Sequence, residues 1–125
     1  MRGVLLVDDD RGWTEAMLLY LQLYGIAGVA AGNGEQGWQL LQEGFRPSVI
    51  VLDLMMPVVD GTAFRSRQLA QPDLAAIPII VCSAGFDARR AAERLGARAF
   101  IEKPVRPSDL LRLIQDLSDT PSADV

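Results

Sequence analysis

Short runs of apolar residues recur along the chain about every 20–25 residues. They are rich in β-branched side chains and do not alternate with polar residues, a pattern typical of strands buried on both faces of a parallel sheet. The runs that predict strands are Val4–Val7, Ile26–Ala30, Val49–Leu52, Ile77–Val81 and Ala99–Ile101.

The segments between these runs have helical periodicity. In the first, one helical face carries apolar side chains and is predicted to pack on the sheet: Ala16, Leu19, Tyr20 and Leu23. The second is predicted to begin at Asn33, because Gln36 follows three residues later, as in a helix N-cap. Further helices are expected over residues 61–70, 87–95 and 108–117.

Glycine and proline mark the ends of these segments. Pro107 suits the first turn of the last helix. Gly25, Gly44 and Gly96 lie where three of the helices should end. The chain is therefore predicted to be an α/β protein of five βα units, with helices on both faces of one five-stranded parallel sheet. One domain is expected over residues 1–117, and the polar residues 118–125 are expected to be a flexible tail or the start of a linker.

The charge, cysteine and histidine content exclude several classes of partner and chemistry. The net charge is −4, which argues against nucleic acid and membrane surfaces as direct partners. Residues 1–62 carry a net charge of −5 and residues 63–125 a net charge of +1, so the acidic excess belongs to the first half. Cys82 is the single cysteine, and no leader or spanning segment is expected, so we predict a reducing, cytoplasmic location. The chain has no histidine, which excludes histidine-based acid–base chemistry.

Polar residues follow four of the predicted strands, at the edge where ligands bind in such sheets: Asp8, Asp9 and Asp10, then Asp53, Ser83 and Lys103. Two carboxylates about 4 Å apart repel by about 4 kcal/mol at an effective dielectric constant of about 20. A Mg²⁺ ion bound by several carboxylates would offset this repulsion. A carboxylate can also act as a nucleophile, so the set predicts a site that accepts a phosphoryl group on an aspartate.

Four stretches carry a resemblance to a known family: LLVDDD, VIVLDLMMPVVDG, IIVCSAG and AFIEKP. In this order and at this spacing, the chain resembles the receiver domain of response regulators in two-component signalling, over about residues 2–117. The resemblance implies a flavodoxin-like fold with strand order 2-1-3-4-5. It also implies a phosphorelay acceptor that assists its own phosphorylation and dephosphorylation, rather than an enzyme acting on a separate substrate.

The resemblance assigns roles to individual residues. Asp53 would receive the phosphoryl group, forming an aspartyl phosphate, from a histidine kinase or a histidine phosphotransfer protein. Ser83 and Lys103 would bind the phosphoryl oxygens, and Phe100 would change its rotamer as the switch. The Lys103–Pro104 bond would be cis. The Mg²⁺ ligands would be Asp53, Asp9, the backbone carbonyl of Met55 and, through water, Asp8.

The resemblance and the helical periodicity also suggest which surfaces bind partners. The helix at 87–95, the strand at 99–101 and the helix at 108–117 would form the switching surface, which would bind a downstream effector or output domain and is a candidate homodimer interface. Leu18 and Leu21 are predicted to point outward as a docking patch for the phosphodonor. Four arginines make the region of residues 89–98 basic, either as a solvated face or as a site for an acidic partner.

Two alternatives stay open at this point. The same fold could serve as an interaction module that works without phosphorylation. Asp10 could bind metal, although capping the first helix is favoured. The stretch GNGEQG at 32–37 matches a dinucleotide fingerprint, but a turn and helix start explain it more simply.

Overall fold

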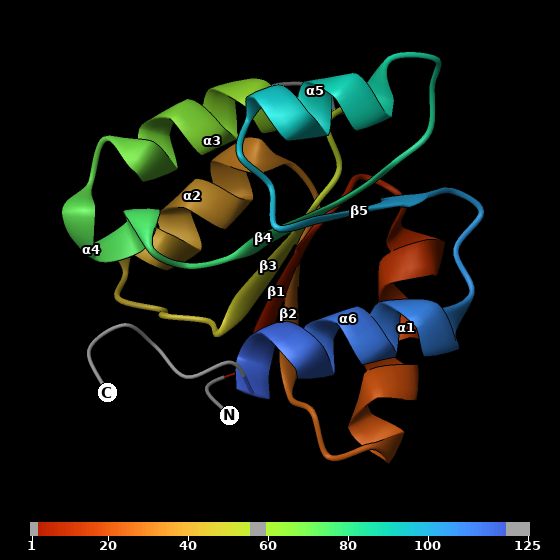
Figure 1. Cartoon of the computed structure of the whole chain (residues 1–125). Helices are drawn as coiled ribbons and strands as arrows, with labels where there is room; N and C mark the ends of the chain where they lie inside the picture. Colours follow the sequence, from red (N-terminus) through yellow and green to blue (C-terminus); the bar gives the residue numbers. More distant parts are fainter. Residues whose placement is uncertain (1–2, 56–59, 120–125) are drawn as a thin grey trace.

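A five-stranded parallel sheet forms the centre of the molecule, with strand order β2-β1-β3-β4-β5. A computed structural model describes residues 3–55 and 60–119, and Figure 1 shows the arrangement. The strands are β1 (Val4–Val7), β2 (Gly28–Ala31), β3 (Val49–Leu52), β4 (Ile79–Ser83) and β5 (Ala99–Glu102). The helices are α1 (Arg11–Leu23), α2 (Gly34–Gln42), α3 (Gly61–Leu69), α4 (Pro72–Ala75), α5 (Ala88–Arg94) and α6 (Pro107–Asp119). The predicted α/β architecture of five βα units and its strand order are confirmed.

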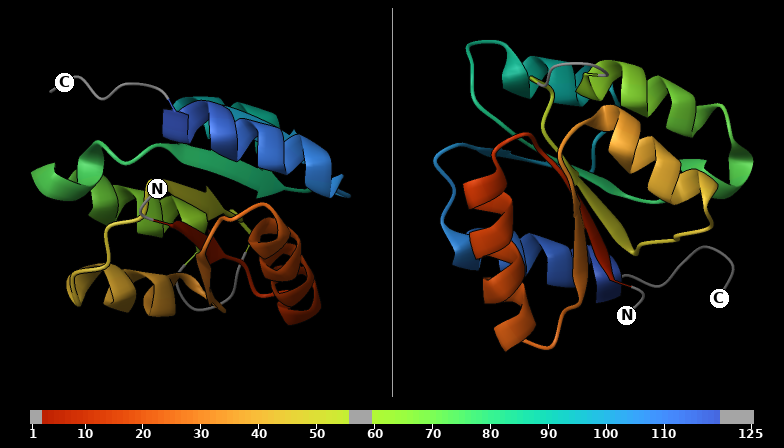
Figure 2. Two further views of the ribbon diagram at one scale, coloured as in Figure 1. Left: turned by 90° about the horizontal axis from the view of Figure 1, so that it is seen from below. Right: turned by 180° about the vertical axis from the view of Figure 1, so that it is seen from behind.

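Helices cover both faces of the sheet, as Figure 2 shows from behind. α1 and α6 pack on one face, where Met17, Leu21 and Ile114 are buried against β1 and β3. α2, α3, α4 and α5 pack on the other, around the fully buried Phe64. β1, β3 and β4 are buried along their whole length, as their apolar runs predict, whereas the edge strands β2 and β5 are partly exposed.

Two strands begin two residues later than predicted. Ile26 and Ile77 are buried, but their amides donate to Leu21 and Leu74, which belong to the preceding helices. The first residues of each apolar run therefore close a helix instead of opening a strand. The one-turn helix α4, with Pro72 in its first turn, is not predicted by the periodicity because it is too short to show one.

The predicted inner face of α1 is wrong. The side chains buried against the sheet are Thr14, Met17 and Leu21, while Leu19 is 65% and Leu23 is 81% exposed. The periodicity failed at Thr14, a polar residue that can be buried because its hydroxyl donates to the Arg11 carbonyl at 3.1 Å.

This register also removes the predicted docking patch. Leu21 is fully buried, and Leu18 is partly buried with its side chain against β2, where a Cβ on Gly28 would lie 2.6 Å from Leu18 Cδ2. Leu21 is therefore a core residue and Leu18 packs against the core, so the two do not form the predicted outward patch.

The predicted cap at Asn33 and the glycines predicted to follow three helices are confirmed. Asn33 caps α2 by accepting from the Gln36 amide, and Gln36 Oε1 accepts from the Gly32 amide at 2.7 Å. Gly37 packs so closely that a Cβ there would lie 3.1 Å from both Val7 and Phe64, so the glycines of GNGEQG serve a helix start and a tight contact. Gly25, Gly44 and Gly96 follow helices with positive φ, and α6 begins at Pro107. α6 extends to Asp119, two residues beyond the predicted end of the domain, and residues 120–125 lie outside the described part of the chain.

Candidate functional site

The carboxyl ends of the strands bring the predicted site residues together. The ladder bonds continue one residue past the strands: the Asp8 amide donates to Ala31, the Asp53 amide to Val7 and the Lys103 amide to Ser83, each at about 3 Å. Each functional residue is thus held by the sheet itself. Asp8, Asp53 and Ser83 are buried, although all three are polar.

Asp53 is 6% exposed, and both of its carboxylate oxygens have partners. Oδ1 accepts from the Ser83 hydroxyl at 2.8 Å and from the Met55 amide at 3.0 Å. Oδ2 lies 3.3 Å from Lys103 Nζ. Asp53 therefore faces a hydroxyl on one side and an ammonium on the other, and Oδ2 has the fewer and longer contacts.

Lys103 lies between two carboxylates. Its ammonium donates to Asp8 Oδ2 at 2.6 Å as well as to Asp53, and its side chain is 22% exposed. Burial by itself would lower the pKa of Lys103, but the hydrogen bond with Asp8 and the charges of both carboxylates outweigh it and raise that pKa. Burial raises the pKa of Asp8, because its side chain is only 2% exposed and the bonds from Lys103 and the Asp10 amide offset the burial only in part.

The ammonium offsets part of the repulsion between the Asp8 and Asp53 carboxylates. The acidic cluster also offers a metal site: one carboxylate oxygen each from Asp8, Asp9 and Asp53 lie within 4.8 Å of one another, with Asp9 on the exposed side. Hard carboxylate oxygens are the ligands that Mg²⁺ prefers. Asp10 is excluded from this set because it caps α1, accepting from the Trp13 amide at 3.0 Å.

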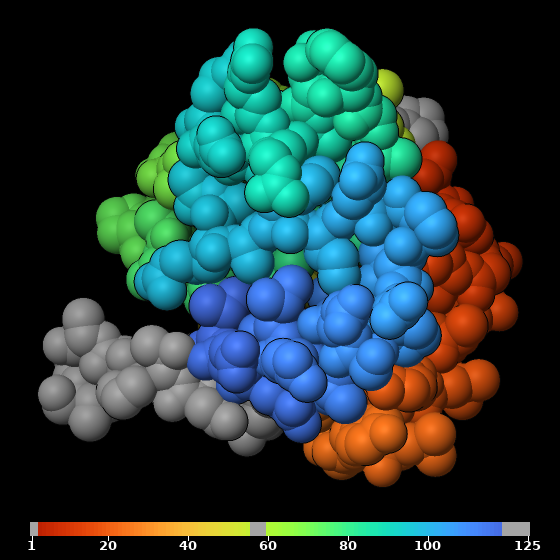
Figure 3. Space-filling model, turned by 45° about the vertical axis from the view of Figure 1, so that its right-hand side comes forward, coloured from red at the N-terminus to blue at the C-terminus, as the bar shows by residue number. Residues whose placement is uncertain are grey.

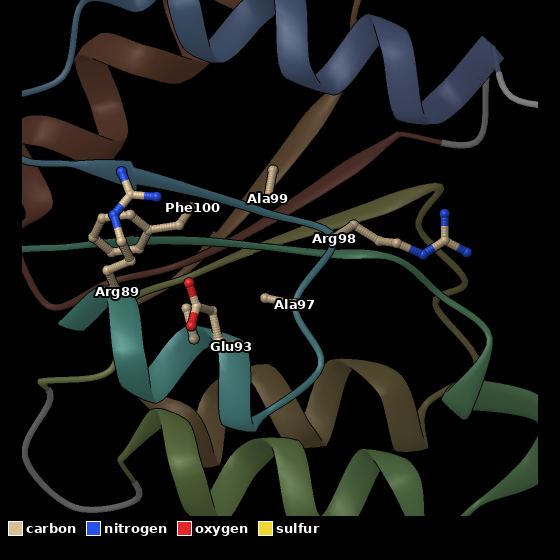
Figure 4. Close-up of a pocket in the computed structure, with 7 residues that line it drawn as sticks. Arg89, Glu93, Ala97, Arg98, Ala99 and Phe100 are labelled. Carbon is tan, nitrogen blue, oxygen red and sulfur yellow. The ribbon is translucent and has the colours of Figure 1, made fainter. Parts of the chain in front are cut away.

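Phe100 lies behind the site on β5, opposite Val81 in the register with β4. Its ring is partly buried, and the Arg89 guanidinium lies 5.0 Å from the ring centroid, close enough for a cation–π contact. Figure 4 shows Arg89 beside Phe100 at one end of a hollow of about 260 Å³, with Glu93 and Ala97 between it and Arg98 at the other end. The sequence shows the basic arginines of residues 89–98, but no local pattern indicates that Arg89 contacts Phe100.

Two further residues, Cys82 and Trp13, lie near the site. Cys82 is buried, and burial raises the pKa of its thiol to about 12, so it is a small core residue and not a nucleophile. Trp13, which follows the Asp10 cap, lies 5.2 Å from Lys103 Nζ, measured to the ring centroid. Within residues 3–55 and 60–119, no helix is both long and apolar enough to cross a membrane.

Comparison with known proteins gives one consistent result. The model of the response regulator receiver domain matches residues 4–115. The chain is 31% identical over 118 residues to response regulator Rre1 of Synechocystis sp., covering 92% of this chain and 51% of that protein. It is 34% identical over 118 residues to the transcriptional regulatory protein GltR of Pseudomonas aeruginosa, covering 93% of this chain and 48% of that protein. The chain thus spans about half the length of these two relatives.

A solved structure of a receiver protein has the same fold. A response regulator receiver protein from Pseudomonas putida superposes with a TM-score of 0.82 at 34% identity, covering 90% of this chain and 94% of that one.

Proposed function

The chain belongs to the response regulator receiver domain family, whose members are phosphoacceptor signalling domains, and we propose that Asp53 is its phosphoacceptor. The observation that carries this proposal is the position of the Asp53 carboxylate between the Ser83 hydroxyl at 2.8 Å and the Lys103 ammonium at 3.3 Å. These two donors suit two of the oxygens of an incoming phosphoryl group. The alternative, an interaction module that works without phosphorylation, leaves this assembly of donors and acids without a use.

In the proposed reaction, a carboxylate oxygen of Asp53 forms a bond to phosphorus while the P–N bond of a phosphohistidine breaks, and the departing imidazole takes up a proton. Oδ2 is the better nucleophile because Oδ1 already accepts two hydrogen bonds. Lys103, whose raised pKa keeps it protonated, neutralises charge on the transferred group. Mg²⁺, when bound, would supply further neutralisation of negative charge at the site. Its ligands would be Asp9 and Asp53 directly, Asp8 through water and the backbone carbonyl of Met55.

Phosphorylation would change the acceptor of the Ser83 hydroxyl from Asp53 to a phosphoryl oxygen. Ser83 is the last residue of β4 and pairs with Glu102 of β5, so its movement is transmitted to the strand that carries Phe100. As Phe100 turns inward, it leaves the Arg89 guanidinium, and the equilibrium of the surface made by α5, β5 and α6 shifts. Figure 3 shows α5, β5 and α6, coloured teal to blue, as one continuous face.

Partners follow from this scheme. A cytoplasmic histidine kinase or a histidine phosphotransfer protein would supply the phosphoryl group, and an effector or output domain would read the α5–β5–α6 surface. The same surface is a candidate homodimer interface. GltR, a relative named as a transcriptional regulatory protein, is about twice as long as this chain.

The test is phosphorylation by a small donor. The purified chain is incubated with acetyl phosphate and Mg²⁺, and the intact mass is followed together with sensitivity to hydroxylamine, which cleaves acyl phosphates. We expect one phosphoryl group per chain, none in Asp53→Asn and an unchanged level in Asp60→Asn. Asp60 is a matched control because its carboxylate only caps α3. Absence of labelling in the wild-type chain, or equal labelling of Asp53→Asn, would favour the interaction module instead.

A further inference from the structure

Trp13 lies beside the ammonium of Lys103. The ammonium of Lys103 is held by Asp8 at 2.6 Å and by Asp53 at 3.3 Å, and the indole ring of Trp13 lies 5.2 Å from it. This distance is within the range of cation–π attraction, and tryptophan is the strongest partner among the aromatic side chains. The ammonium therefore has two carboxylates and one aromatic ring around it.

The position of the indole is determined by the acidic loop. The Asp8 carboxylate accepts from the Asp10 amide at 2.9 Å, and the Asp10 carboxylate accepts from the Trp13 amide at 3.0 Å. Trp13 also packs against the core cluster that contains Met17 and Leu110. Asp8, a member of the acidic cluster, and the indole are thus joined through Asp10 within one short hydrogen-bonded segment.

This arrangement matters when a divalent cation binds. The shortest contact of the ammonium is with Asp8, which is also a member of the metal cluster. A cation that binds Asp8 weakens the ion pair between Asp8 and Lys103. The ion pair with Asp53, which is longer, then remains. Without another attraction, the flexible lysine side chain would turn toward water.

We propose that Trp13 is a positioning residue for Lys103, whose ammonium the indole holds over Asp53 when the Asp8 carboxylate is engaged by the divalent cation. This inference rests on the proposed function, because it assigns Trp13 a part in the transfer of the phosphoryl group to Asp53. Trp13 contacts no reacting atom and acts only through Lys103.

The kinetic test compares Trp13→Leu with Trp13→Phe in the full chain, using acetyl phosphate and Mg²⁺. Leucine keeps apolar bulk without an aromatic face, and phenylalanine keeps a face. We expect Trp13→Leu to slow phosphorylation about three- to tenfold, the range that a partly desolvated cation–π contact supports, and Trp13→Phe to retain most of the rate. In a Lys103→Met background, Trp13→Leu should cause no further slowing.

Trp38→Leu is the matched control. Trp38 also lies beneath a cation, with Arg67 at 5.9 Å, but it packs on the opposite face of the sheet. Its replacement should leave the phosphorylation rate unchanged.

A spectroscopic test uses the fact that Lys103 is the only lysine in the chain. Protein labelled with ¹³C at the lysine ε-carbon gives a single side-chain signal, and the ring current of Trp13 should displace its protons upfield. The displacement should vanish in Trp13→Leu, persist in part in Trp13→Phe and survive the addition of Mg²⁺. A displacement that disappears when Mg²⁺ is added would instead assign Trp13 a merely structural role.

The outcomes separate the two proposals. If the wild-type chain is phosphorylated on Asp53 but Trp13→Leu reacts at the wild-type rate, or slows the Lys103→Met chain equally, the role of Trp13 is refuted and the proposed function stands. A lysine signal that is the same with and without the indole refutes it as well. If Asp53 is never phosphorylated, the proposed function fails, and the inference about Trp13 fails with it.

Discussion

Arg65 on α3 is a buried cation, and its removal should destabilise the fold strongly. Its Nε donates to the Leu95 carbonyl at 2.9 Å, and Nη2 approaches the Gly96 carbonyl at 3.4 Å. These two residues follow α5, so the guanidinium caps the C-terminal end of that helix, where positive charge is favourable. Nη1 donates to Gln68 Oε1 at 2.7 Å, and Gln68 Nε2 in turn donates to the carbonyls of Leu74 and Ile77.

The expected loss for Arg65→Met is about 2–4 kcal/mol. Bonds from a charged donor contribute about 1.5–3 kcal/mol each, but the burial that lowers the pKa of Arg65 also opposes its charge and reduces the sum. The carbonyl of Gly96 lies on an exposed residue and can be rehydrated. Gln68 is fully buried, and its unpaired Oε1 should cost about 1–3 kcal/mol by itself.

Arg67→Met is the matched control on the same helix. The Arg67 guanidinium pairs with Glu35 at 3.2 Å, but both side chains are 44% exposed, and such pairs contribute at most about 1 kcal/mol. The assay is urea unfolding followed by far-UV circular dichroism. Arg65→Met should lower the midpoint by about 1–2 M at an unchanged slope, and Arg67→Met by a small fraction of that. Equal midpoints for the two variants would refute the capping argument.

Three further predictions concern the acidic site. Ser83→Ala removes the 2.8 Å bond to Asp53 and should slow phosphorylation by acetyl phosphate about tenfold, whereas Ser83→Thr should not; equal rates for the two variants would contradict the assigned role. Lys103→Met leaves two buried carboxylates without their cation and should cost about 2–3 kcal/mol in EDTA, partly regained with Mg²⁺. Urea midpoints in the two buffers measure this, and a wild-type midpoint in EDTA would be inconsistent with it. Asp8→Asn should stabilise the metal-free chain at pH 7, because the raised pKa of Asp8 means that its ionised form is disfavoured in the folded state. That advantage should shrink as the pH falls through the raised pKa toward the ordinary value of 3.8, and an advantage that grows on acidification would reverse the assigned sign.

The apolar runs predicted the five strands, and the family resemblance implied their order, which the sheet confirms. Central strands buried on both faces leave an unmistakable apolar run, and β1, β3 and β4 each carry one. In a parallel sheet, all carboxyl ends lie at one edge, so Asp8, Asp53, Ser83 and Lys103 were expected at that edge, where their side chains are in contact. Local signals sufficed for the helix ends as well, since Asn33 and Asp10 cap the helices that immediately follow them.

The inner face of α1 is a matter that only the tertiary structure decided. Thr14 counts as polar in a hydrophobic periodicity, so the pattern predicted that the helical face with Leu19 and Leu23 packs on the sheet. The packed structure buries Thr14 because a local hydrogen bond satisfies its hydroxyl, and that rotation moved Leu21 from the predicted surface into the core. A pattern of hydrophobic and polar residues does not show that a polar side chain can be buried because it hydrogen-bonds to the backbone of its own helical turn.

Contacts between distant segments were equally beyond the sequence. Trp13 beside Lys103, Arg89 beside Phe100 and Arg65 at the end of α5 each join residues from different elements. The residue types alone gave no sign of these pairs, because an arginine or tryptophan on a helix most often lies at the surface or in the core. The chain's local patterns thus determined which elements form and where the chemistry gathers. Their three-dimensional packing determined how each charge is held, because a side chain's partners depend on the rotation and position of neighbouring helices, which no local pattern encodes.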